Sequence, residues 1–350
     1  MGRAAGAPPA LSPGVRPGPV LTEDGPVQTF LPVPDFEASA RLLDQARLGK
    51  QRVETLQVLR ALELEDYGWG SHPVTRMWRG RTPALVAYGL ATVRVWTASG
   101  RADATGPQIA EFAPEVEGMP QQELGRAGLL PGWLGQEALH LSHRSNLLAK
   151  DPDFYGPRFA PLFGPEPADL PYVWPEPDDV PAPPAPEGVG AWVVRPRDDD
   201  ELAVCLELGV VGLGDQAGVE VDAGGMTPAE LTALAKERTG RRPAKALRQL
   251  SAFLDQVRPG DFVALPVEQG ATLLLGEVTG DYAHAGREGA PLPHRRAVRW
   301  AGAVPRAAAR PPATLQDPRA LFRVVLDPEV LASAPRRLTD VPGAVRPPAS

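Results

Sequence analysis

The sequence is short of cysteine, histidine and lysine: it has one Cys, five His and four Lys among 350 residues. A lone Cys205 excludes an internal disulfide framework and a zinc site built on several thiolates, and it is typical of proteins kept in a reducing compartment. The scattered histidines form no H-E-x-x-H pattern, and neither a phosphate loop nor a dinucleotide fingerprint is present. We therefore expect no metal and no other cofactor.

Long hydrophobic runs are also missing. The longest apolar stretches, such as 271–276, fall far short of the roughly 20 residues that a membrane span requires. Residues 4–20 lack the apolar core of a signal peptide. We expect a cytoplasmic, nucleoid-associated protein with no membrane partner.

Positive charge is in deficit overall, with 36 Lys and Arg against 43 Asp and Glu and a net charge of −7. Phosphate contacts need cations, so this balance argues against a nucleic-acid partner. The distribution argues the other way, because residues 41–101 contain ten basic and five acidic side chains. The local excess favours nucleic-acid binding in the first half of the chain.

The chain divides into five stretches by composition and periodicity. Residues 1–26 and 328–350 are predicted to be disordered tails, and 164–189 is a proline-rich linker. The stretch 27–163 is predicted to be mainly α, with helices over 38–62, 82–99 and 136–150. The stretch 190–327 is predicted to be α+β. Its strands are expected at 191–195, 209–213, 261–266, 271–278, 297–300 and 321–325, with helices at 227–239 and 244–257.

One helix face carries a cluster with chemical potential. Arg47, Lys50 and Glu54 lie at i, i+3 and i+7, so they share one side of the first long helix. A carboxylate among cations can act as a base, or stabilise the positive charge that grows on a sugar as its base leaves. The plain alternative is a solvated helix face with an ion pair between Lys50 and Glu54.

A set of short motifs gives this cluster a context: TFLP at 29–32, RLLD at 41–44, RLGKQRVE at 47–54, GSHP at 70–73, MW at 77–78, WL at 133–134, SHRS at 142–145 and KDPDFY at 150–155. In order and spacing the set resembles the bacterial branch of the pyrimidine-dimer DNA glycosylases, the phage endonuclease V type, over about residues 28–175. The resemblance implies a mainly helical DNA glycosylase, with abasic-site lyase activity, that flips a nucleotide out of duplex DNA.

In that family an amine attacks the sugar C1′ while a glutamate assists, and the glutamate falls on Glu54. The amine belongs to the first residue of the mature phage enzymes, but here the matching segment begins at residue 27 or 28. Either the protein begins at Val27, or the amine is a lysine, of which Lys50 is preferred to Lys150. The resemblance and the local charge also suggest a set of DNA contacts: Arg47, Arg52, His72, His143, Arg144, Phe154 and Tyr155.

A second group of motifs lies in the other half: WVVR at 192–195, GVVGLG at 209–214, VRPGDFVALP at 257–266, LGEVTG at 275–280 and HRRAVRW at 294–300. They resemble the N-terminal domain of Mrr-type restriction proteins, an EVE-like member of the PUA superfamily, over about 190–326. The resemblance implies a cleft that holds a modified or flipped base. The residues expected to line it are Trp192, Gly212, Gly214, Arg299 and Trp300. A purely structural domain is the alternative.

These observations predict a two-part enzyme that excises damaged or modified pyrimidines from double-stranded DNA, with a reader of modified bases attached. Two alternatives remain open. One is a non-enzymatic binder of damaged or modified nucleic acid, in repair or in phage defence. The other is an RNA-modification protein, because PUA-like folds often serve RNA.

Overall fold

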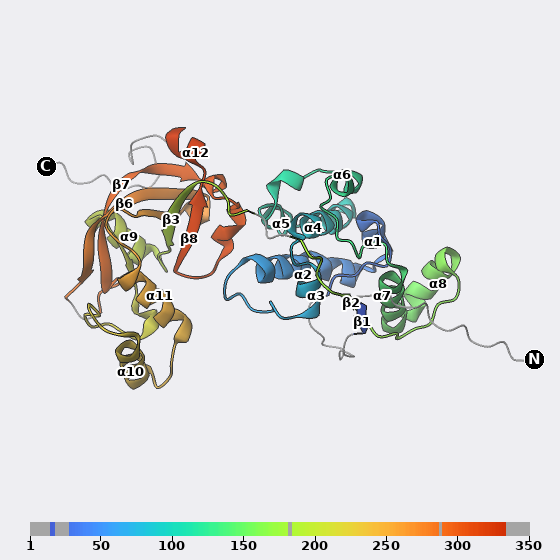
Figure 1. Ribbon diagram of the computed structural model, residues 1–350, viewed down its shortest axis with the longest axis horizontal. Helices are drawn as coiled ribbons and strands as arrows, with labels where there is room; N and C mark the ends of the chain where they lie inside the picture. The colour runs from blue at the N-terminus through green and yellow to red at the C-terminus, as the bar shows by residue number, and fades with distance from the viewer. Residues whose placement is uncertain (1–14, 18–27, 181–183, 287–288, 334–350) are drawn as a thin grey trace, which may run out of the picture. The chain divides into compact units, whose positions relative to one another are not determined.

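The structure is a computed structural model of the 350-residue chain, and it describes residues 15–17, 28–180, 184–286 and 289–333. The chain forms two compact units, 1–184 and 185–350, and the boundary between them falls inside the predicted linker. The first unit is helical and the second combines a sheet with helices (Figure 1), so the predicted fold class is confirmed. Among the described residues, no helix is long and apolar enough to cross a membrane.

The helical unit contains eight α-helices within the described residues. Their bounds are α1 Phe36–Leu42, α2 Gln45–Glu63, α3 Pro73–Met77, α4 Thr82–Ala98, α5 Gly106–Ala110, α6 Gln121–Arg126, α7 Glu137–Lys150 and α8 Pro152–Phe163. A short 3₁₀ turn, η1, spans Pro114–Val116, and two three-residue strands, β1 Val15–Pro17 and β2 Val173–Pro175, pair antiparallel.

The single helix predicted over 38–62 is two helices in the structure. Asp35 caps α1 by accepting from the amide of Ala38, and Asp44 caps α2 by accepting from the amide of Arg47. A carboxylate that accepts from the third amide of a helix satisfies one of the four donors left free there. The break at Leu43 and Asp44 was hidden because the apolar rhythm runs through it unchanged.

Helices α2 and α4 form the centre of the helical unit and pack closely where Gly89 meets Thr55. A Cβ at Gly89 would lie 2.7 Å from Cγ2 of Thr55 and 3.1 Å from Cγ2 of Ile109. Glycine therefore lets the two helices approach along their buried faces. Those faces include Leu56 and Leu59.

The second unit is built on a six-stranded sheet in the order β4-β7-β6-β5-β3-β8. The strand bounds are β3 Val189–Val194, β4 Val210–Leu213, β5 Phe262–Val267, β6 Thr272–His284, β7 His294–Pro305 and β8 Leu321–Leu326. Neighbouring strands are antiparallel except for β3 and β5, which are parallel. All six predicted strands are present, and β6 and β7 are longer than predicted.

Four α-helices accompany the sheet: α9 Asp199–Leu208, α10 Pro228–Thr239, α11 Ala244–Asp255 and α12 Pro328–Ser333. Short 3₁₀ turns lie at η2 Asp215–Ala217, η3 Glu268–Gly270, η4 Arg306–Ala308 and η5 Pro312–Gln316. Helix α10 begins with a capping box between Thr227 and Glu230 and ends at Gly240, whose φ of 68° favours glycine. The sequence prediction missed α9.

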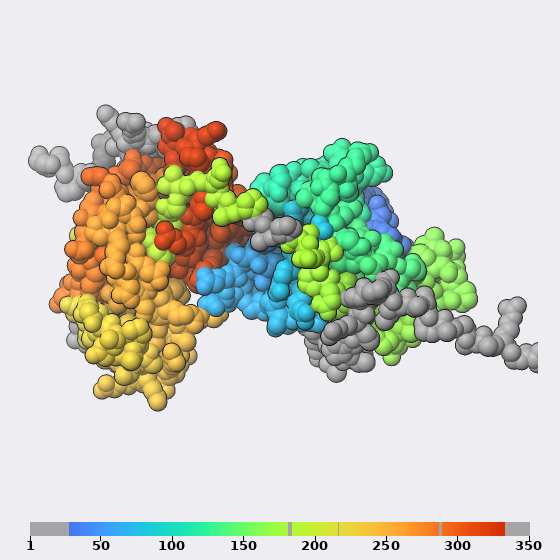
Figure 2. All heavy atoms as spheres, in the orientation of Figure 1, coloured from blue at the N-terminus to red at the C-terminus, as the bar shows by residue number. Residues whose placement is uncertain are grey.

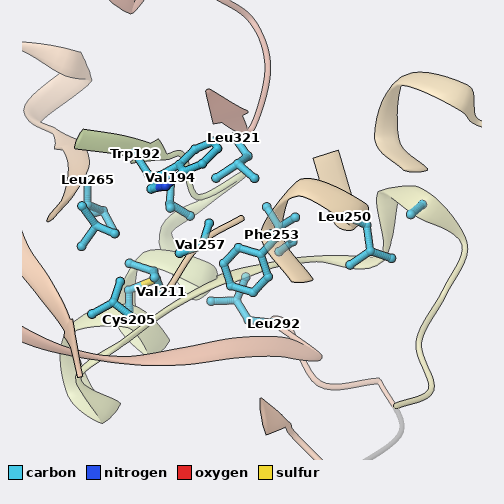
Figure 3. Packing of buried hydrophobic residues seen from close by; sticks show 14 of the residues in the cluster. Trp192, Val194, Cys205, Val211, Leu250, Phe253, Val257, Leu265, Leu292 and Leu321 are labelled. Atoms are coloured by element: carbon cyan, nitrogen blue, oxygen red, sulfur yellow. The ribbon is translucent and has the colours of Figure 1, made fainter. Parts of the chain in front are cut away.

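Alternate residues of the sheet face two separate apolar cores. Trp192 and Val194 of β3 point to the core shared with α9, α10 and α11, which also buries Cys205 and Phe253 (Figure 3). Ala191 and Val193 of the same strand face the second core, which Leu315 and residues of η4 complete. Both faces of the sheet are therefore covered.

Of the two predicted tails, residues 1–14, 18–26 and 334–350 lie outside the described residues. Within the tails the structure describes β1 and α12. Within the predicted linker it describes β2. Trp174 of this strand contacts His72, and Tyr172, just before the strand, contacts His143.

Candidate functional site

An extended segment, residues 28–32, runs through the core of the helical unit and is fastened there by side chains. Gln51 of α2 holds its first half. The Gln51 Nε2 group donates to the carbonyl of Gln28 at 2.8 Å, and Oε1 accepts from the amide of Phe30 at 2.9 Å. The hydroxyl of Tyr88 from α4 lies 3.0 Å from the Phe30 carbonyl and 2.5 Å from Gln51 Oε1. Side chains here take the place of a neighbouring strand.

Helix α7 holds the second half of the segment. The amide of Leu31 donates to Nδ1 of His143 at 2.8 Å, and its carbonyl accepts from Nδ1 of His140 at 2.8 Å. The Arg144 guanidinium donates to the carbonyl of Pro32 at 2.9 Å. His140 and His143 are fully buried and Arg144 is 2% exposed. These three side chains fix the path of the segment, so its first residue has a defined position.

That position is next to Glu54. The backbone N–H of Gln28 donates to the Glu54 carboxylate, and Gln51 Nε2 donates to Oε2 of Glu54 at 2.7 Å. Burial raises the pKa of Glu54 above its ordinary value, against the opposing effects of the Lys50 charge and these two hydrogen bonds. The carboxylate is therefore a stronger base than an exposed glutamate.

Glu54 opens onto a groove of about 660 Å³. Its lining comes mainly from one side of α2 and from Trp96 at the end of α4: Gln45, Ala46, Gly49, Lys50, Val53, Glu54, Gln57 and Trp96. A Cβ at Gly49 would lie 3.1 Å from the Trp96 ring, so glycine lets the tryptophan close this side. Both predicted catalytic residues, Lys50 and Glu54, line this groove. Lys150, the other lysine considered, ends α7 and is not part of the groove lining.

Two arginines that were predicted DNA contacts flank the groove on α2. Arg47 forms an ion pair with Asp44, whose carboxylate also accepts from the hydroxyl of Tyr155 at 2.5 Å. Its guanidinium lies 5.6 Å from the centre of the Tyr155 ring. These contacts join Arg47 to Tyr155, so two of the predicted DNA contacts form one cluster.

Arg52 occupies the other flank. It forms an ion pair with Asp103, and its guanidinium stacks 4.1 Å from the centre of the Trp96 ring. Arg101 lies 5.0 Å from the centre of the same ring. Trp96 is only partly buried and forms a wall of the groove, with the guanidinium groups of both arginines near its ring.

The other predicted DNA contacts have different surroundings. His143 and Arg144 are buried, and they belong to the side chains that hold residues 28–32 in place. We call this set the clamp: Gln51, Tyr88, His140, His143 and Arg144. Arg144 also pairs with Glu137 and with Glu166. Burial lowers the pKa of His143 to about 3, so the ring is neutral and its Nδ1 can accept from Leu31. His72 caps α3 by accepting from the amide of Val74, beyond the far end of α2.

Phe154 is part of α8, where the Arg158 guanidinium lies 3.6 Å from its ring centre. Neither Phe154 nor His72 is part of the groove lining. The structure thus joins Arg47 to Tyr155 through Asp44 and stacks Arg52 on Trp96 of the groove wall, whereas it uses His143 and Arg144 to position the segment.

Sequence reasoning missed three residues of this site: Gln51, Tyr88 as a polar contact, and Tyr172. The Tyr172 hydroxyl bonds the side chain of Gln28, and burial raises the pKa of Tyr172 to about 12. Gln51 had a readable signal, because it is a polar residue at a position where the helical rhythm places the core. Tyr172 had none, since it lies in the proline-rich stretch.

In the second unit, the residues predicted to line a base-reading cleft do not come together. Trp192 is 4% exposed, donates to Asp261 at 3.2 Å and packs in the core. A Cβ at Gly212 would lie 2.5 Å from the carbonyl oxygen of His294, so this glycine allows β4 and β7 to pair closely. Arg299 is exposed and pairs with Glu277 on the neighbouring strand, while Trp300 packs against the core.

Gly214, the fifth of these residues, does line a pocket of about 320 Å³. Leu213 and Gly214 form one side of it at the end of β4, and Ala246, Gln249 and Leu250 of α11 form another. Three arginines, Arg195, Arg197 and Arg319, complete the polar part of the lining. The volume lies at the lower end of the roughly 300–1,000 Å³ of small-ligand sites.

Comparisons with known proteins agree with part of this interpretation. Residues 27–105, which contain α1, α2, α3 and α4 with Glu54, match the family model described as pyrimidine dimer DNA glycosylase. Residues 194–311 match a family model described as a domain of unknown function. No curated protein and no solved structure matches the chain. The first match supports a DNA glycosylase acting on pyrimidine dimers. The second leaves the role of the sheet unit to be proposed.

Proposed function

We propose that this protein is a DNA glycosylase that excises damaged or modified pyrimidines from duplex DNA in the groove along α2. The observation that carries the proposal is the contact between Glu54 and the amide of Gln28 at the edge of an open groove. The contact places the first residue of the segment 28–32 beside a partly buried carboxylate. It lies within the stretch that matches the glycosylase family model.

The chemistry suits a carboxylate with a raised pKa. An amine attacks C1′ of the flipped nucleotide, the bond from C1′ to the base breaks, and the bonding electron pair leaves with the base, which takes up a proton. Glu54 accepts the proton that the amine releases and faces the positive charge that develops on the sugar. Opening of the sugar ring then leaves a Schiff base, from which strand cleavage at the abasic site can follow.

The amine is the α-amino group of a form of the protein whose first residue is Val27. The Gln28 amide already bonds Glu54. Because consecutive Cα atoms are about 3.8 Å apart, an amine on the residue before Gln28 would start close to this carboxylate. An amine there is held by the clamp rather than by a flexible side chain, which is the positioning that nucleophilic catalysis needs. Lys50 is the second candidate, because it lines the same groove.

The sheet unit is proposed to read the base that marks the target, through the pocket between β4 and α11. Its apolar wall at Leu213, Ala217 and Leu250 can cover the face of a ring. The amide of Gln249 and the nearby arginines supply polar groups for the ring edge. Of the five residues first predicted for this role, Gly214 is the one this placement retains.

Borohydride trapping tests the enzymatic proposal. The duplexes carry a cyclobutane pyrimidine dimer, a modified cytosine or an abasic site, and the proteins are the full chain and a form that begins at Val27, released from a cleavable fusion. We expect a covalent adduct with the Val27 form, and we expect Glu54→Gln to lower its rate by about 10²- to 10⁴-fold, the usual contribution of a general base.

Lys50→Gln in both forms identifies the nucleophile. An adduct in the Val27 form that survives Lys50→Gln supports the α-amine. An adduct in both forms that Lys50→Gln removes assigns the chemistry to Lys50. If no form reacts with any duplex while binding to DNA is intact, the enzymatic proposal is overturned in favour of a non-enzymatic binder. Tight binding to RNA alone would point to an RNA-modification protein.

A further inference from the structure

The hairpin formed by α10 and α11 is strongly basic although the protein as a whole is acidic. Residues 236–248 contain six cations and one carboxylate, Glu237, against 36 cations and 43 carboxylates in the whole chain. All six cations are exposed: Lys236, Arg238, Arg241, Arg242, Lys245 and Arg248. The hairpin lies on the surface of the sheet unit (Figure 2).

The two arginines at the tip of the hairpin have free side chains. Arg241 and Arg242 lie in the turn that follows Gly240, and their backbones close it through Thr239 and Ala244. Among the described residues neither guanidinium forms an ion pair, whereas Arg238 pairs with Glu220 at 3.4 Å. Exposed cations that bind no internal carboxylate are available to an anionic partner.

Helix α11 has three sides with different surroundings: the core, the pocket and the outer surface. Leu247, Leu250 and Phe253 are buried in the core, and Ala246, Gln249 and Leu250 line the pocket. At 100° per residue, Lys245 and Arg248 lie on the side opposite the core. The basic face and the pocket lining are therefore different sides of one helix.

We propose that the α10–α11 hairpin binds the phosphodiester backbone of duplex DNA and delivers it to the adjacent pocket. The proposal rests on the proposed function for its choice of DNA. Cations at the hairpin tip and along the outer face of α11 neutralise phosphates and carry no sequence information, while the pocket reads a base. One helix then contributes to both contacts, which sets the distance between the bound strand and the base being read.

The salt dependence of DNA binding by the full-length protein tests this role. Arg241→Gln/Arg242→Gln is compared with the matched variant Arg258→Gln/Arg310→Gln, which removes the same charge from exposed positions elsewhere in the unit. The probe is a fluorescein-labelled 20-base-pair duplex without damage, titrated at 50–200 mM salt. Each lost phosphate contact lowers the slope of log K against log salt by about 0.9.

The tip variant should therefore lose about 1.8 from the slope, and its Kd ratio to wild type should shrink about tenfold between 50 and 200 mM salt. The matched variant should keep the wild-type slope. Equal slopes for the tip variant and wild type would overturn the proposal, as would equal losses in the two variants. A loss confined to duplex RNA, or to labelled polyglutamate, would assign the hairpin to RNA or to an acidic protein instead.

Repeating the titration in a Glu54→Gln background separates this proposal from the glycosylase proposal. That substitution leaves the hairpin intact, so the slope difference should persist. A protein that never traps on DNA but still shows the slope loss retains the hairpin role, whereas normal trapping with no slope loss refutes the hairpin alone.

Discussion

The two units hold extended chain in opposite ways. In the sheet unit, β3 lies between β5 and β8, so neighbouring backbones satisfy its peptide groups. In the helical unit, residues 28–32 have side-chain partners instead, supplied by α2, α4 and α7. A ladder of hydrogen bonds between strands tolerates side-chain changes, because backbone groups form those bonds. A clamp depends on particular side chains, and it places the end of its segment at a defined point beside Glu54.

The sharpest test of this contrast compares two glutamines that each join a helix to extended chain. Gln51 bonds Gln28 and Phe30 in the helical core, and it is fully buried. Gln249 accepts from the amides of Ala320 and Leu321 beside the pocket, where it is partly exposed. An unpaired buried polar group costs about 1–3 kcal/mol, whereas a group that water reaches costs less.

Gln51→Leu should therefore lower the free energy of unfolding of the helical unit by about 3 kcal/mol, since it leaves two buried backbone groups unpaired. Gln249→Leu should lower that of the sheet unit by about 1 kcal/mol. Urea unfolding, monitored by hydrogen exchange of amides in each unit, measures both losses in the free energy of unfolding. In Gln51→Leu the amides of residues 30 and 31 should lose protection from exchange. Equal losses would show that the clamp is no more dependent on its side chains than the ladder.

Acid should lower the free energy of unfolding of the helical unit, which contains the clamp, more than that of the sheet unit. The pKa of His143 is about 3 in the folded state, against an ordinary value of 6.5, because burial disfavours the charged ring. The unfolded chain takes up a proton below pH 6.5 that the folded chain cannot, so stability is full above pH 6.5 and falls as the pH drops towards 3. By pH 5 His143 alone costs about 2 kcal/mol.

Burial also lowers the pKa values of His140 and His72, which adds to this effect in the helical unit. In the sheet unit the pKa of His294 is lowered for the same reason. His143→Gln should remove about 2 kcal/mol of the change between pH 7.5 and pH 5 in the helical unit, as measured by urea unfolding at each pH. His294→Gln should leave the pH dependence of that unit unchanged.

Much of the fold could be read from periodicity, because alternation and the helical repeat report burial directly. Four strands of the sheet unit, β3, β4, β5 and β8, and helices α4 and α7 were predicted within a few residues, whereas β6 and β7 extend well beyond their predicted ends. The groove was harder, since Ala46 and Val53 continue the apolar rhythm of α2 and look like core. In the structure they line the groove, with Val53 44% exposed. An apolar residue that faces a ligand site carries the same pattern as one that faces another helix.

The polar residues also fall into two groups, those whose neighbours are close in sequence and those whose partners are distant. Lys50 and Glu54 were predicted together because helical spacing places them on one face, and in the structure both line the groove. His143 and Arg144 were predicted to contact DNA, but their clamp partners, Leu31 and Pro32, are more than 100 residues away in sequence. Distant contacts also explain the residues predicted for the base-reading cleft. Gly212 is glycine because β4 pairs closely with β7, and spacing along the chain does not reveal that pairing.

The smallest expected effect concerns Gly49, where the groove wall meets α2. Alanine in a helix interior is about 0.5–1 kcal/mol better than glycine, but here its Cβ would lie 3.1 Å from the Trp96 ring. The ring faces the open groove and can shift by a few tenths of an ångström, so Gly49→Ala should raise the free energy of unfolding by about 0.5 kcal/mol. The control Gly125→Ala meets Leu130 at an ordinary 3.4 Å and should gain somewhat more.

The same substitution should weaken DNA binding, because moving Trp96 disturbs both the groove wall and the stacked Arg52. A more stable protein that binds damaged duplex less tightly would show that Gly49 is retained for the groove rather than for the fold. If Gly49→Ala lowers stability and leaves binding unchanged, Trp96 is a fixed structural residue. The groove would then end at Lys50 and Glu54, and the clamp alone would define the site.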